Sequence, residues 1–320
     1  MRILRSLLAL LLLAAASPLA AQSYPSQPIK LIAPFPPGGS VDITARLVAE
    51  PLADALNGKI YIENRSGASG NIGMEAAARA KPDGYTIVLN TIPLVTNQSL
   101  FEHLTWDPIK DFAPIGMIAT SPHVLVVPLK TPATTVQELL RLARANPGKL
   151  SYASAGVGTT FHFCGEMFKD ATGTFILHVP YRGGGPALQD TLGGQVDMSF
   201  PTLAAALPFV KAGSLRALAV TDSKRSALLP DVPTLQEAGL KDFQFTQWLA
   251  LLAPAGTPAE VVARLNGALR NALDSKELRE KFQAQAMEPF ITSAQEAGKF
   301  IAAEVQRYSR IIKARGITAQ

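Results

Sequence analysis

Short strand-like segments alternate with helical segments along most of this chain. The strand-like segments are apolar or β-branched and are bounded by Gly, Pro or polar residues; they cover 29–33, 59–63, 85–90, 124–127, 175–179 and 215–221. Helical patterns lie between them, for example over residues 41–57 and 136–145. This alternation predicts an α/β fold with mainly parallel sheets.

The final third of the chain has a different pattern. Apolar residues recur at four-residue spacing after Pro258, and further helices are predicted at 277–286 and from Ser293 onward. No strand is predicted between these helices, so we expect them to cover the outside of a sheet formed earlier in the chain. In the first predicted helix, Pro51 is expected to cause a kink or a restart.

The length and composition favour a two-domain globular protein. A chain of 320 residues exceeds what one hydrophobic core usually organises. Hydrophobic residues make up 48% of the sequence, which excludes a disordered protein. The formal charge of +5 is small and the sequence has no run of Lys or Arg, so nucleic acid is not an expected partner.

The N-terminus predicts export from the cytoplasm. A basic start with Arg2 and Arg5 precedes an apolar run over residues 7–16, and small residues follow up to Ala21. This order is typical of a secretory signal peptide. The apolar run is too short for a spanning helix, which needs about 20 residues. We therefore expect residues 1–21 to be removed near Ala21, which would lower the formal charge to +3.

Cysteine and histidine usage indicates neither a disulfide nor a metal site. Cys164 is the single cysteine, and its aromatic neighbours predict a buried, inert thiol. The four histidines show no ligand spacing with one another. We therefore expect no metal and no cofactor.

Two strand–turn–helix segments share one construction. Residues 32–42 and 152–160 each run from a strand through a glycine-containing turn into a helix. Each turn would leave unpaired backbone N–H groups at a helix N-terminus, where an anion can bind. If the turns belong to different domains, they predict a site for an acidic ligand in the cleft between the domains. Alternatively, both are ordinary connections with Ser40 and Thr159 as N-caps.

Several other features leave two interpretations open. Tyr181 would line the cleft or fill a packing role. Arg182 would pair with a second carboxylate or remain solvated. His162 favours a core or capping role over ligand contact, and Trp248 would pack at a hinge or form a cleft wall. The glycine-rich loop 67–73 departs from a dinucleotide-binding fingerprint, which favours a loop that packs a helix onto the sheet.

An ordered set of short motifs extends over essentially the whole mature chain. The motifs are YPSQPI at 24–29, PPGGSVD at 36–42, ENRSGASGNIG at 63–73, KPDGY at 81–85, SAGVGT at 154–159, VPYRGGG at 179–185, LPDVPT at 229–234, EAG at 237–239 and APAGTP at 253–258. In this order they resemble the substrate-binding receptors of tripartite tricarboxylate transporters, the Bug receptor family.

The resemblance implies a two-domain periplasmic-binding-protein fold of the Venus-flytrap, type II class, with two hinge crossings. Domain 1 would comprise residues 22–122 plus 245–320, and domain 2 would comprise residues 123–244. The crossings would lie near 121–124 and 245–252. Closure of the two domains would bring both glycine turns onto one ligand.

The resemblance also implies a function. A monomeric, non-enzymatic receptor in the periplasm would pass a small organic acid to a membrane permease of one large and one small subunit. The acid would be a di- or tricarboxylate or an aromatic carboxylate, held through waters and main-chain groups of the two turns. The expected ligand-binding residues are Phe35, Pro37, Gly38, Gly39, Asp42, Ser154, Gly156, Gly158, Thr159, Thr160, Tyr181 and Thr202. Thr202 stands where family members often carry Asp or another polar residue, which makes a ligand with a cationic amine less expected.

Two other classes of function are weighed against the receptor. A periplasmic sensor that feeds a two-component signalling system would use the same closed, liganded shape. A secreted hydrolase is the other alternative. Ser154 lacks the Gly-x-Ser-x-Gly elbow, however, and the spacing of His and acidic residues predicts no triad around it.

Overall fold

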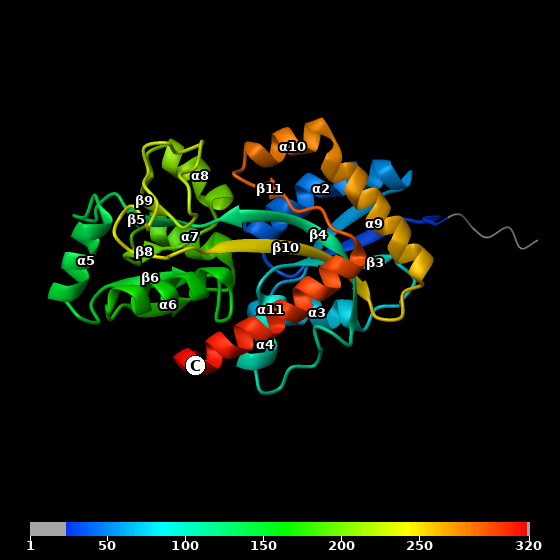
Figure 1. Cartoon of the computed structure of the whole chain (residues 1–320), viewed down its shortest axis with the longest axis horizontal. Coiled ribbons are helices and arrows are strands. Elements are labelled where there is room, and N and C mark those ends of the chain that lie inside the picture. The colour runs from blue at the N-terminus through cyan, green and yellow to red at the C-terminus, as the bar shows by residue number, and fades with distance from the viewer. Residues whose placement is uncertain (1–23, 319–320) are drawn as a thin grey trace, which may run out of the picture.

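The computed structural model describes residues 24–318 and places their strands in two separate sheets. The first sheet has the order β11-β4-β10-β3-β1-β2, and the second has the order β7-β6-β8-β5-β9. Figure 1 shows that each sheet with its helices forms one lobe of an elongated molecule. We call the lobe with the six-stranded sheet lobe 1 and the other lobe 2.

Lobe 1 combines the N-terminal and C-terminal parts of the chain. Its strands are β1 Ile29–Ala33, β2 Ile60–Asn64, β3 Thr86–Asn90, β4 Phe112–Pro122, β10 Thr246–Pro254 and β11 Glu288–Pro289. Its helices are α2 Ser40–Leu56, η1 Ala68–Gly70, α3 Asn71–Ala78, α4 Pro93–Leu100, α9 Ala259–Asp274, α10 Lys276–Gln283 and α11 Ala294–Arg315. Helices α2 and α9 pack together and share one hydrophobic core with strands β1, β3 and β10.

Lobe 2 is formed by the middle of the chain. Its strands are β5 Val124–Pro128, β6 Ser151–Ser154, β7 Leu177–Pro180, β8 Met198–Ser199 and β9 Leu215–Val220. Its helices are α5 Val136–Ala145, α6 Thr160–Thr172, α7 Gly184–Leu192 and α8 Leu203–Lys211. In α5 the apolar residues recur on one side and are buried, which is why this helix follows the predicted range closely.

Two chain crossings join the lobes. Strand β4 ends at Pro122 in the sheet of lobe 1, and β5 begins at Val124 in the sheet of lobe 2. The chain returns through β10, which pairs antiparallel with β4 from Thr246–Pro122 to Pro254–Phe112. The two strands run side by side between the lobes in Figure 1. The predicted boundaries of domains 1 and 2 fall at these crossings and stay a prediction.

Helix α11 adds a further connection across the hinge. On the hinge strand, the Trp248 indole nitrogen donates a hydrogen bond to the buried Glu304 of α11 at 2.8 Å. Further along the helix, the Tyr308 ring contacts the Phe163 ring of lobe 2, with 5.2 Å between centroids. Trp248 therefore packs at the hinge, which decides between the two roles considered for it.

Three expectations about the fold are wrong in part. The sheets are mixed rather than mainly parallel, because β10 returns beside β3 and β4 in the opposite direction and β5 runs against β8 and β9. The two-residue strand β11 lies between helices α10 and α11, where no strand was expected. Helix α2 also continues through Pro51, since Leu52 and Leu56 beyond it are buried in the core of lobe 1.

The structure tests the prediction for Cys164 but not the predicted signal peptide. Cys164 is fully buried and unpaired, as predicted, and burial raises the pKa of its thiol. The predicted signal peptide lies outside the described residues. Among residues 24–318, no helix combines the length and apolar character needed to span a membrane.

Candidate functional site

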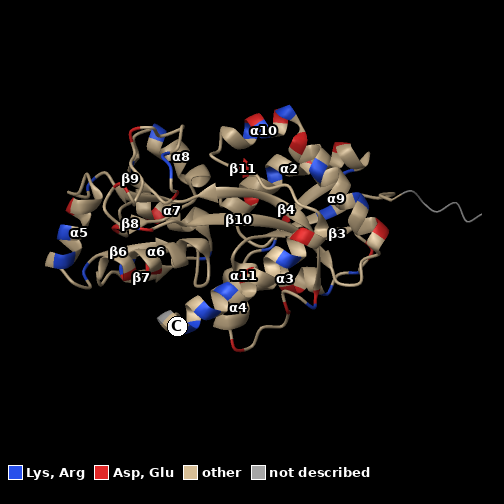
Figure 2. Cartoon of the chain, in the orientation of Figure 1, with Lys and Arg blue, Asp and Glu red and all other residues tan. Residues whose placement is uncertain are grey.

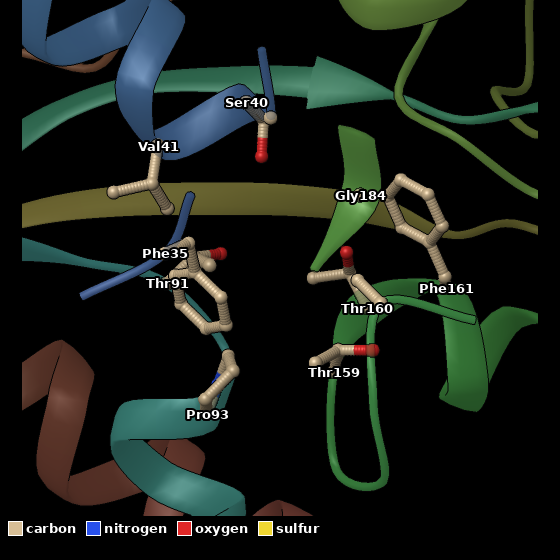
Figure 3. A pocket seen from close by; sticks show the side chains of 11 residues that line it. Phe35, Ser40, Val41, Thr91, Pro93, Thr159, Thr160, Phe161 and Gly184 are labelled. Carbon is tan, nitrogen blue, oxygen red and sulfur yellow. The ribbon is translucent and has the colours of Figure 1, made fainter. Parts of the chain in front are cut away.

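A small cavity lies between the two lobes where several helices begin. Its volume is about 20 Å³. It is lined by Phe35, Gly39, Ser40, Val41, Thr91, Pro93, Ala155, Thr159, Thr160, Phe161 and Gly184. Figure 3 shows these residues facing one another from lobe 1 and lobe 2. We call this space the central cavity.

The central cavity has no charged side chain among its eleven lining residues. Figure 2 shows the Lys, Arg, Asp and Glu residues mostly on outer helices, including α5, α9, α10 and α11. An anion in this cavity would therefore have to be neutralised by backbone dipoles and hydroxyl groups.

Helices α2, α4, α6 and α7 all begin at the wall of the central cavity. None of their four N-cap residues (Gly39, Ile92, Thr159 and Gly183) accepts a capping hydrogen bond through its side chain. Of the helices that begin elsewhere, α5, α8, α10 and α11 each have a Ser or Thr side chain as cap, whereas α3 and α9 have none. Free N–H groups at a helix N-terminus carry partial positive charge. At α4, Pro93 has no N–H, and the Leu94, Val95 and Thr96 N–H groups bond to the Thr91 and Ile92 carbonyls. The cavity therefore collects three termini, those of α2, α6 and α7, whose first N–H groups no side chain has satisfied.

Hydroxyl groups add hydrogen-bonding capacity to this wall. Figure 3 shows the Ser40 and Thr160 hydroxyls directed into the space between the lobes. The Thr91 hydroxyl is buried and has no hydrogen-bond partner among the described residues, and the amide nitrogens of Asn90 and Gln247 are in the same situation. A buried polar group without a partner costs about 1–3 kcal/mol, so such groups gather where a polar ligand or water binds.

Asp42 holds the first glycine turn in place. Its carboxylate accepts hydrogen bonds from the Gly38 backbone at 3.1 Å, from the Asn64 amide at 2.9 Å and from the Arg46 guanidinium at 2.9 and 3.0 Å. Burial opposes ionisation of Asp42, but the hydrogen bonds from Arg46, Asn64 and Gly38 outweigh it and lower the pKa of this carboxyl group. The side chain predicted to contact ligand is thus committed to the turn.

We expect the Asp42→Asn variant to lose about 2 kcal/mol of unfolding free energy, because an amide cannot accept all these hydrogen bonds. Exposed Arg46 contributes little to this loss, since solvent screens its charge. Urea unfolding monitored by circular dichroism measures the change. The control is Asp274→Asn, which removes an exposed ion pair with Arg279 and should change stability by less than about 0.5 kcal/mol. Equal losses in both variants would contradict the role of Asp42.

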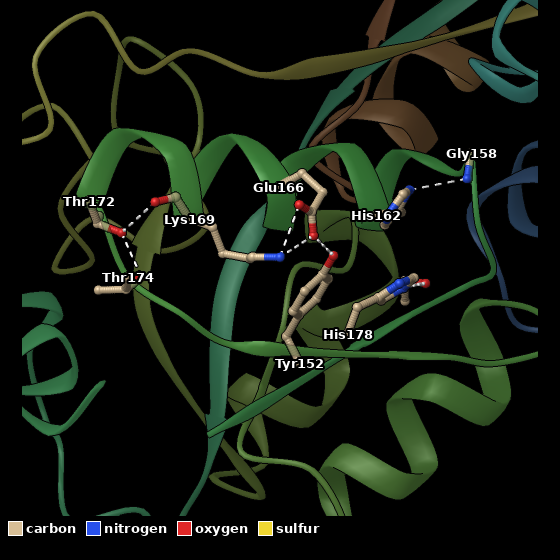
Figure 4. A network of polar contacts seen from close by, with 9 residues as sticks. Tyr152, Gly158, His162, Glu166, Lys169, Thr172, Thr174 and His178 are labelled. Carbon is tan, nitrogen blue, oxygen red and sulfur yellow. Dashed lines mark hydrogen bonds and ion pairs between the residues drawn. The ribbon is translucent and has the colours of Figure 1, made fainter. Parts of the chain in front are cut away.

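The second glycine turn is held by a chain of side-chain contacts (Figure 4). The Ser154 hydroxyl lies 2.6 Å from His178 Nε2 and accepts a hydrogen bond from the Gly156 backbone at 3.1 Å. The Gly158 backbone N–H donates to His162 Nδ1 at 3.2 Å, and the His162 and His178 rings stack at 4.3 Å. His162 therefore supports the turn from inside the helix, as the sequence favoured.

Two buried histidines and the half-buried His178 should make stability fall in mild acid. Burial lowers the pKa of His123 to about 3, of His162 to about 4 and of His178 to about 3, and in His178 the neighbouring His162 adds to this shift. All three are neutral in the folded state, whereas an unfolded chain takes up protons below its histidine pKa of about 6.5. Stability is therefore complete above about pH 6.5 and falls between there and pH 4, by up to about 1.4 kcal/mol per pH unit for each group.

Urea unfolding at a series of pH values tests this expectation. In the His178→Gln variant, the amide can still bond Ser154 but cannot titrate. We expect this variant to show a shallower fall in stability below pH 6.5. The same slope in the variant and the original protein would contradict a contribution from His178.

The twelve residues predicted for the site fall into three groups. Four line the central cavity: Phe35, Gly39, Thr159 and Thr160. Gly156 and Tyr181 line a neighbouring pocket, and the remaining six (Pro37, Gly38, Asp42, Ser154, Gly158 and Thr202) line neither space. Among these, Thr202 is buried and caps helix α8 by accepting a bond from the Ala205 backbone at 3.4 Å.

The sequence reasoning missed seven lining residues of the central cavity. Ser40 and Val41 lie in the first turn of α2, directly after the predicted Gly39, and the sequence suggested Ser40 only as an N-cap. Phe161 lies in the first turn of α6, directly after the predicted Thr160. Ala155 lies in the SAGVGT motif and Gly184 in the VPYRGGG motif, in which other residues were predicted to bind the ligand. Thr91 and Pro93 lie between strand β3 and helix α4, and a Pro at the start of a helix was an available signal.

The lobes touch across the site. The Thr96 hydroxyl of lobe 1 donates a hydrogen bond to the Gly158 carbonyl of lobe 2 at 2.8 Å. A Cβ atom on Gly158 would lie 2.8 Å from Leu100 and 2.9 Å from Asn97. A Cβ atom on Gly183 would lie 2.3 Å from Pro36. The glycines of lobe 2 thus permit an approach of the two lobes that larger residues would obstruct.

Comparison with known proteins places this fold and site in a family. Residues 44–317 match the model of the tripartite tricarboxylate transporter family receptor. The protein BugT of Bordetella pertussis is 38% identical over 303 residues, which cover 94% of this chain and 93% of BugT.

Two solved structures have the same fold and carry ligands. Rpa4515 of R. palustris with adipate has a TM-score of 0.89 at 36% identity, covering 92% of this chain and 99% of the other. MatC of Rhodopseudomonas palustris with bound malate has a TM-score of 0.85 at 30% identity, covering 90% and 100%. These similarities confirm the two-domain periplasmic-binding-protein fold that the motifs implied. The chain belongs to the receptor family of the tripartite tricarboxylate transporters.

Proposed function

We propose that this protein is a periplasmic receptor that binds a small organic carboxylate in the central cavity and delivers it to a tripartite transporter. The observation that carries the proposal is the meeting of three uncapped helix N-termini, those of α2, α6 and α7, at a wall without charged side chains. Such termini bind anions through backbone N–H groups. The two solved relatives described above hold adipate and malate, which are dicarboxylates.

The hydroxyls of the central cavity fit the same class of ligand. Carboxylate oxygens accept hydrogen bonds only, and Thr91 and Thr160 offer hydroxyl donors. The Ser40 hydroxyl donates to Gln247 Oε1 at 3.4 Å and would have to exchange this long bond for one to the ligand. Thr159 turns its hydroxyl away and donates to the Gly156 carbonyl at 2.6 Å. This leaves the first backbone N–H groups of α6 without competition from their own cap residue.

Ligand entry would require the lobes to separate. A cavity of about 20 Å³ is far smaller than the pockets of about 300–1,000 Å³ that hold small ligands. The hinge strands β4 and β10 would allow this motion, and closure would then bring the N-termini of α2 and α6 to the same ligand. Binding energy would therefore favour the closed arrangement.

The remaining parts of the proposal concern the setting of this receptor. Residues 1–21 act as the signal peptide, with cleavage near Ala21. Residues 22–122 plus 245–320 form domain 1, and residues 123–244 form domain 2. The mature protein is a monomer, and its membrane partner is a permease of one large and one small subunit.

A thermal-shift screen of the mature protein tests the proposed ligand class. The panel contains aliphatic and aromatic carboxylates, acidic and basic amino acids, and sugars. A ligand at 100 times its dissociation constant should stabilise the protein by about 2.7 kcal/mol, which raises the melting temperature clearly. We expect a rise with one or a few carboxylates. A rise with sugars or basic amino acids alone would contradict the proposal.

A further inference from the structure

A second pocket between the lobes adjoins the central cavity. It has a volume of about 300 Å³ and shares Phe35 and Ala155 with the central cavity. Residues 67–70 of lobe 1 form one wall, and residues 180–182 of lobe 2 form the opposite wall. We call this space the outer pocket.

Phe35 lies between the two spaces. It is 8% exposed, and its ring edge would lie 3.0 Å from a Cβ atom on Gly70, a residue of the outer pocket. Phe101 and Val157 add further apolar surface to the outer pocket. A ligand that reaches from one space into the other would therefore pass apolar surface, which favours a hydrocarbon segment between its polar ends.

Arg182 is the only charged residue among those that line the two spaces. It is exposed and forms no hydrogen bond or ion pair within residues 24–318. A guanidinium group binds a carboxylate through two parallel hydrogen bonds. The outer pocket thus contains the type of group that the central cavity lacks.

The backbone on both sides of Arg182 is fixed at the wall of the outer pocket. The Tyr181 backbone donates to the Ser154 carbonyl at 2.9 Å, and its hydroxyl donates to Asp190 at 2.7 Å. On the other side, Gly183 lies so close to Pro36 of lobe 1 that a Cβ atom would not fit. The base of the Arg182 side chain is therefore anchored, and its charged end is free to meet a ligand.

The opposite wall of the outer pocket is strained. Ala68 and Ser69 both adopt the left-handed conformation, with φ of 46° and 53°. This conformation costs a residue with a side chain roughly 1–2 kcal/mol. The Asn97 amide holds the loop by donating to the Ser69 carbonyl at 3.1 Å. Such strain persists where the surrounding structure fixes a particular geometry, often around a ligand.

We propose that the outer pocket binds the second carboxylate of a dicarboxylate with an aliphatic middle segment, with Arg182 as its partner. This inference rests on the proposed function, since the first carboxylate would occupy the central cavity. The receptor then discriminates in favour of diacids that are long enough to pass Phe35. Arg182 acts as the residue that determines this specificity.

Calorimetric titration of the mature protein tests the proposal. The ligands are the dicarboxylates from succinate through suberate, each paired with the monocarboxylate of the same chain length. We expect Arg182→Met to weaken binding of the preferred diacid about tenfold and to leave its monoacid partner nearly unchanged. Arg182→Lys should restore part of the loss, because it keeps the charge without the paired hydrogen bonds.

The control variant is Arg141→Met, which removes the same charge from an exposed position on helix α5 of lobe 2. It should change neither affinity. Equal weakening of diacid and monoacid in Arg182→Met, or no weakening of either, would overturn the role of the outer pocket while the carboxylate receptor stands. If the unmodified protein bound none of these acids but bound another carboxylate in the thermal-shift screen, this inference alone would be wrong. If it bound no carboxylate in either experiment, the proposed function would be wrong as well.

Discussion

A Gly158→Leu variant should lose carboxylate binding, with the dissociation constant rising roughly 100-fold or more while the fold is retained. Gly158 belongs to lobe 2 and contacts helix α4 of lobe 1, where a Cβ atom would lie 2.8 Å from Leu100 and 2.9 Å from Asn97. A leucine there would hold the lobes apart. A ligand that binds only the closed form would then lose, from its binding free energy, the free energy needed to close the obstructed lobes. A cost of about 2.8 kcal/mol raises the dissociation constant 100-fold.

Gly213→Leu is the matched control for this experiment. Gly213 has a φ of 67°, similar to the 80° of Gly158, but a Cβ atom on it would meet nothing within 4 Å. Both variants therefore carry comparable backbone strain, and only Gly158→Leu obstructs closure. Titration calorimetry gives the affinities, and small-angle scattering reports the separation of the lobes. Retained affinity in Gly158→Leu would show that closure at this contact is not needed.

Trp248→Phe should lower the free energy of unfolding by about 3 kcal/mol. The indole nitrogen of Trp248 donates to Glu304, which is 6% exposed, and phenylalanine would leave that carboxylate without this donor. A lost hydrogen bond to a buried charged group costs about 1.5–3 kcal/mol, and the smaller ring adds a cavity term. Arg307 keeps its contact with Glu304 at 3.1 Å, which limits the loss.

Trp106→Phe separates the two contributions. Trp106 is 4% exposed, close to the 3% of Trp248, but its indole nitrogen has no partner among the described residues. Trp106→Phe therefore loses ring volume without losing a hydrogen bond. We expect its loss of unfolding free energy to be smaller than that of Trp248→Phe, with a difference of about 1.5–3 kcal/mol between the two variants. Urea unfolding of both variants measures the difference. Equal losses of unfolding free energy in the two variants would contradict the proposal that the Trp248–Glu304 hydrogen bond stabilises the packing of α11 on the hinge.

Much of the fold could be predicted from the sequence because local patterns there agree with the tertiary structure. Strand β1 and helix α5 have the predicted ends, since a run of buried aliphatic residues and a one-sided apolar stripe each specify a single element. Strands β4 and β10 were not predicted as elements at full length. They are buried on both faces between two lobes, and such apolar runs resemble helices as much as strands.

The candidate site was located through its glycines and only in part through its side chains. The turns before α2 and α6 were found because glycine marks a helix start that a ligand can approach. Thr91 and the start of α4 have no glycine, and their position depends on the way β3 places them beside lobe 2. Asp42 lies within a predicted motif, but its role depends on Arg46 and Asn64, which only the folded chain brings to it.

A crystal structure of the mature protein with its bound acid would test the central claim most directly. The claim is that backbone N–H groups of two facing helices, rather than cationic side chains, neutralise the first carboxylate. We predict one carboxylate within about 3.2 Å of backbone nitrogens in the first turns of α2 and α6, or joined to them by single waters. A complex in which no carboxylate contacts either helix start, and the acid is held by Lys or Arg outside the cleft, would contradict it.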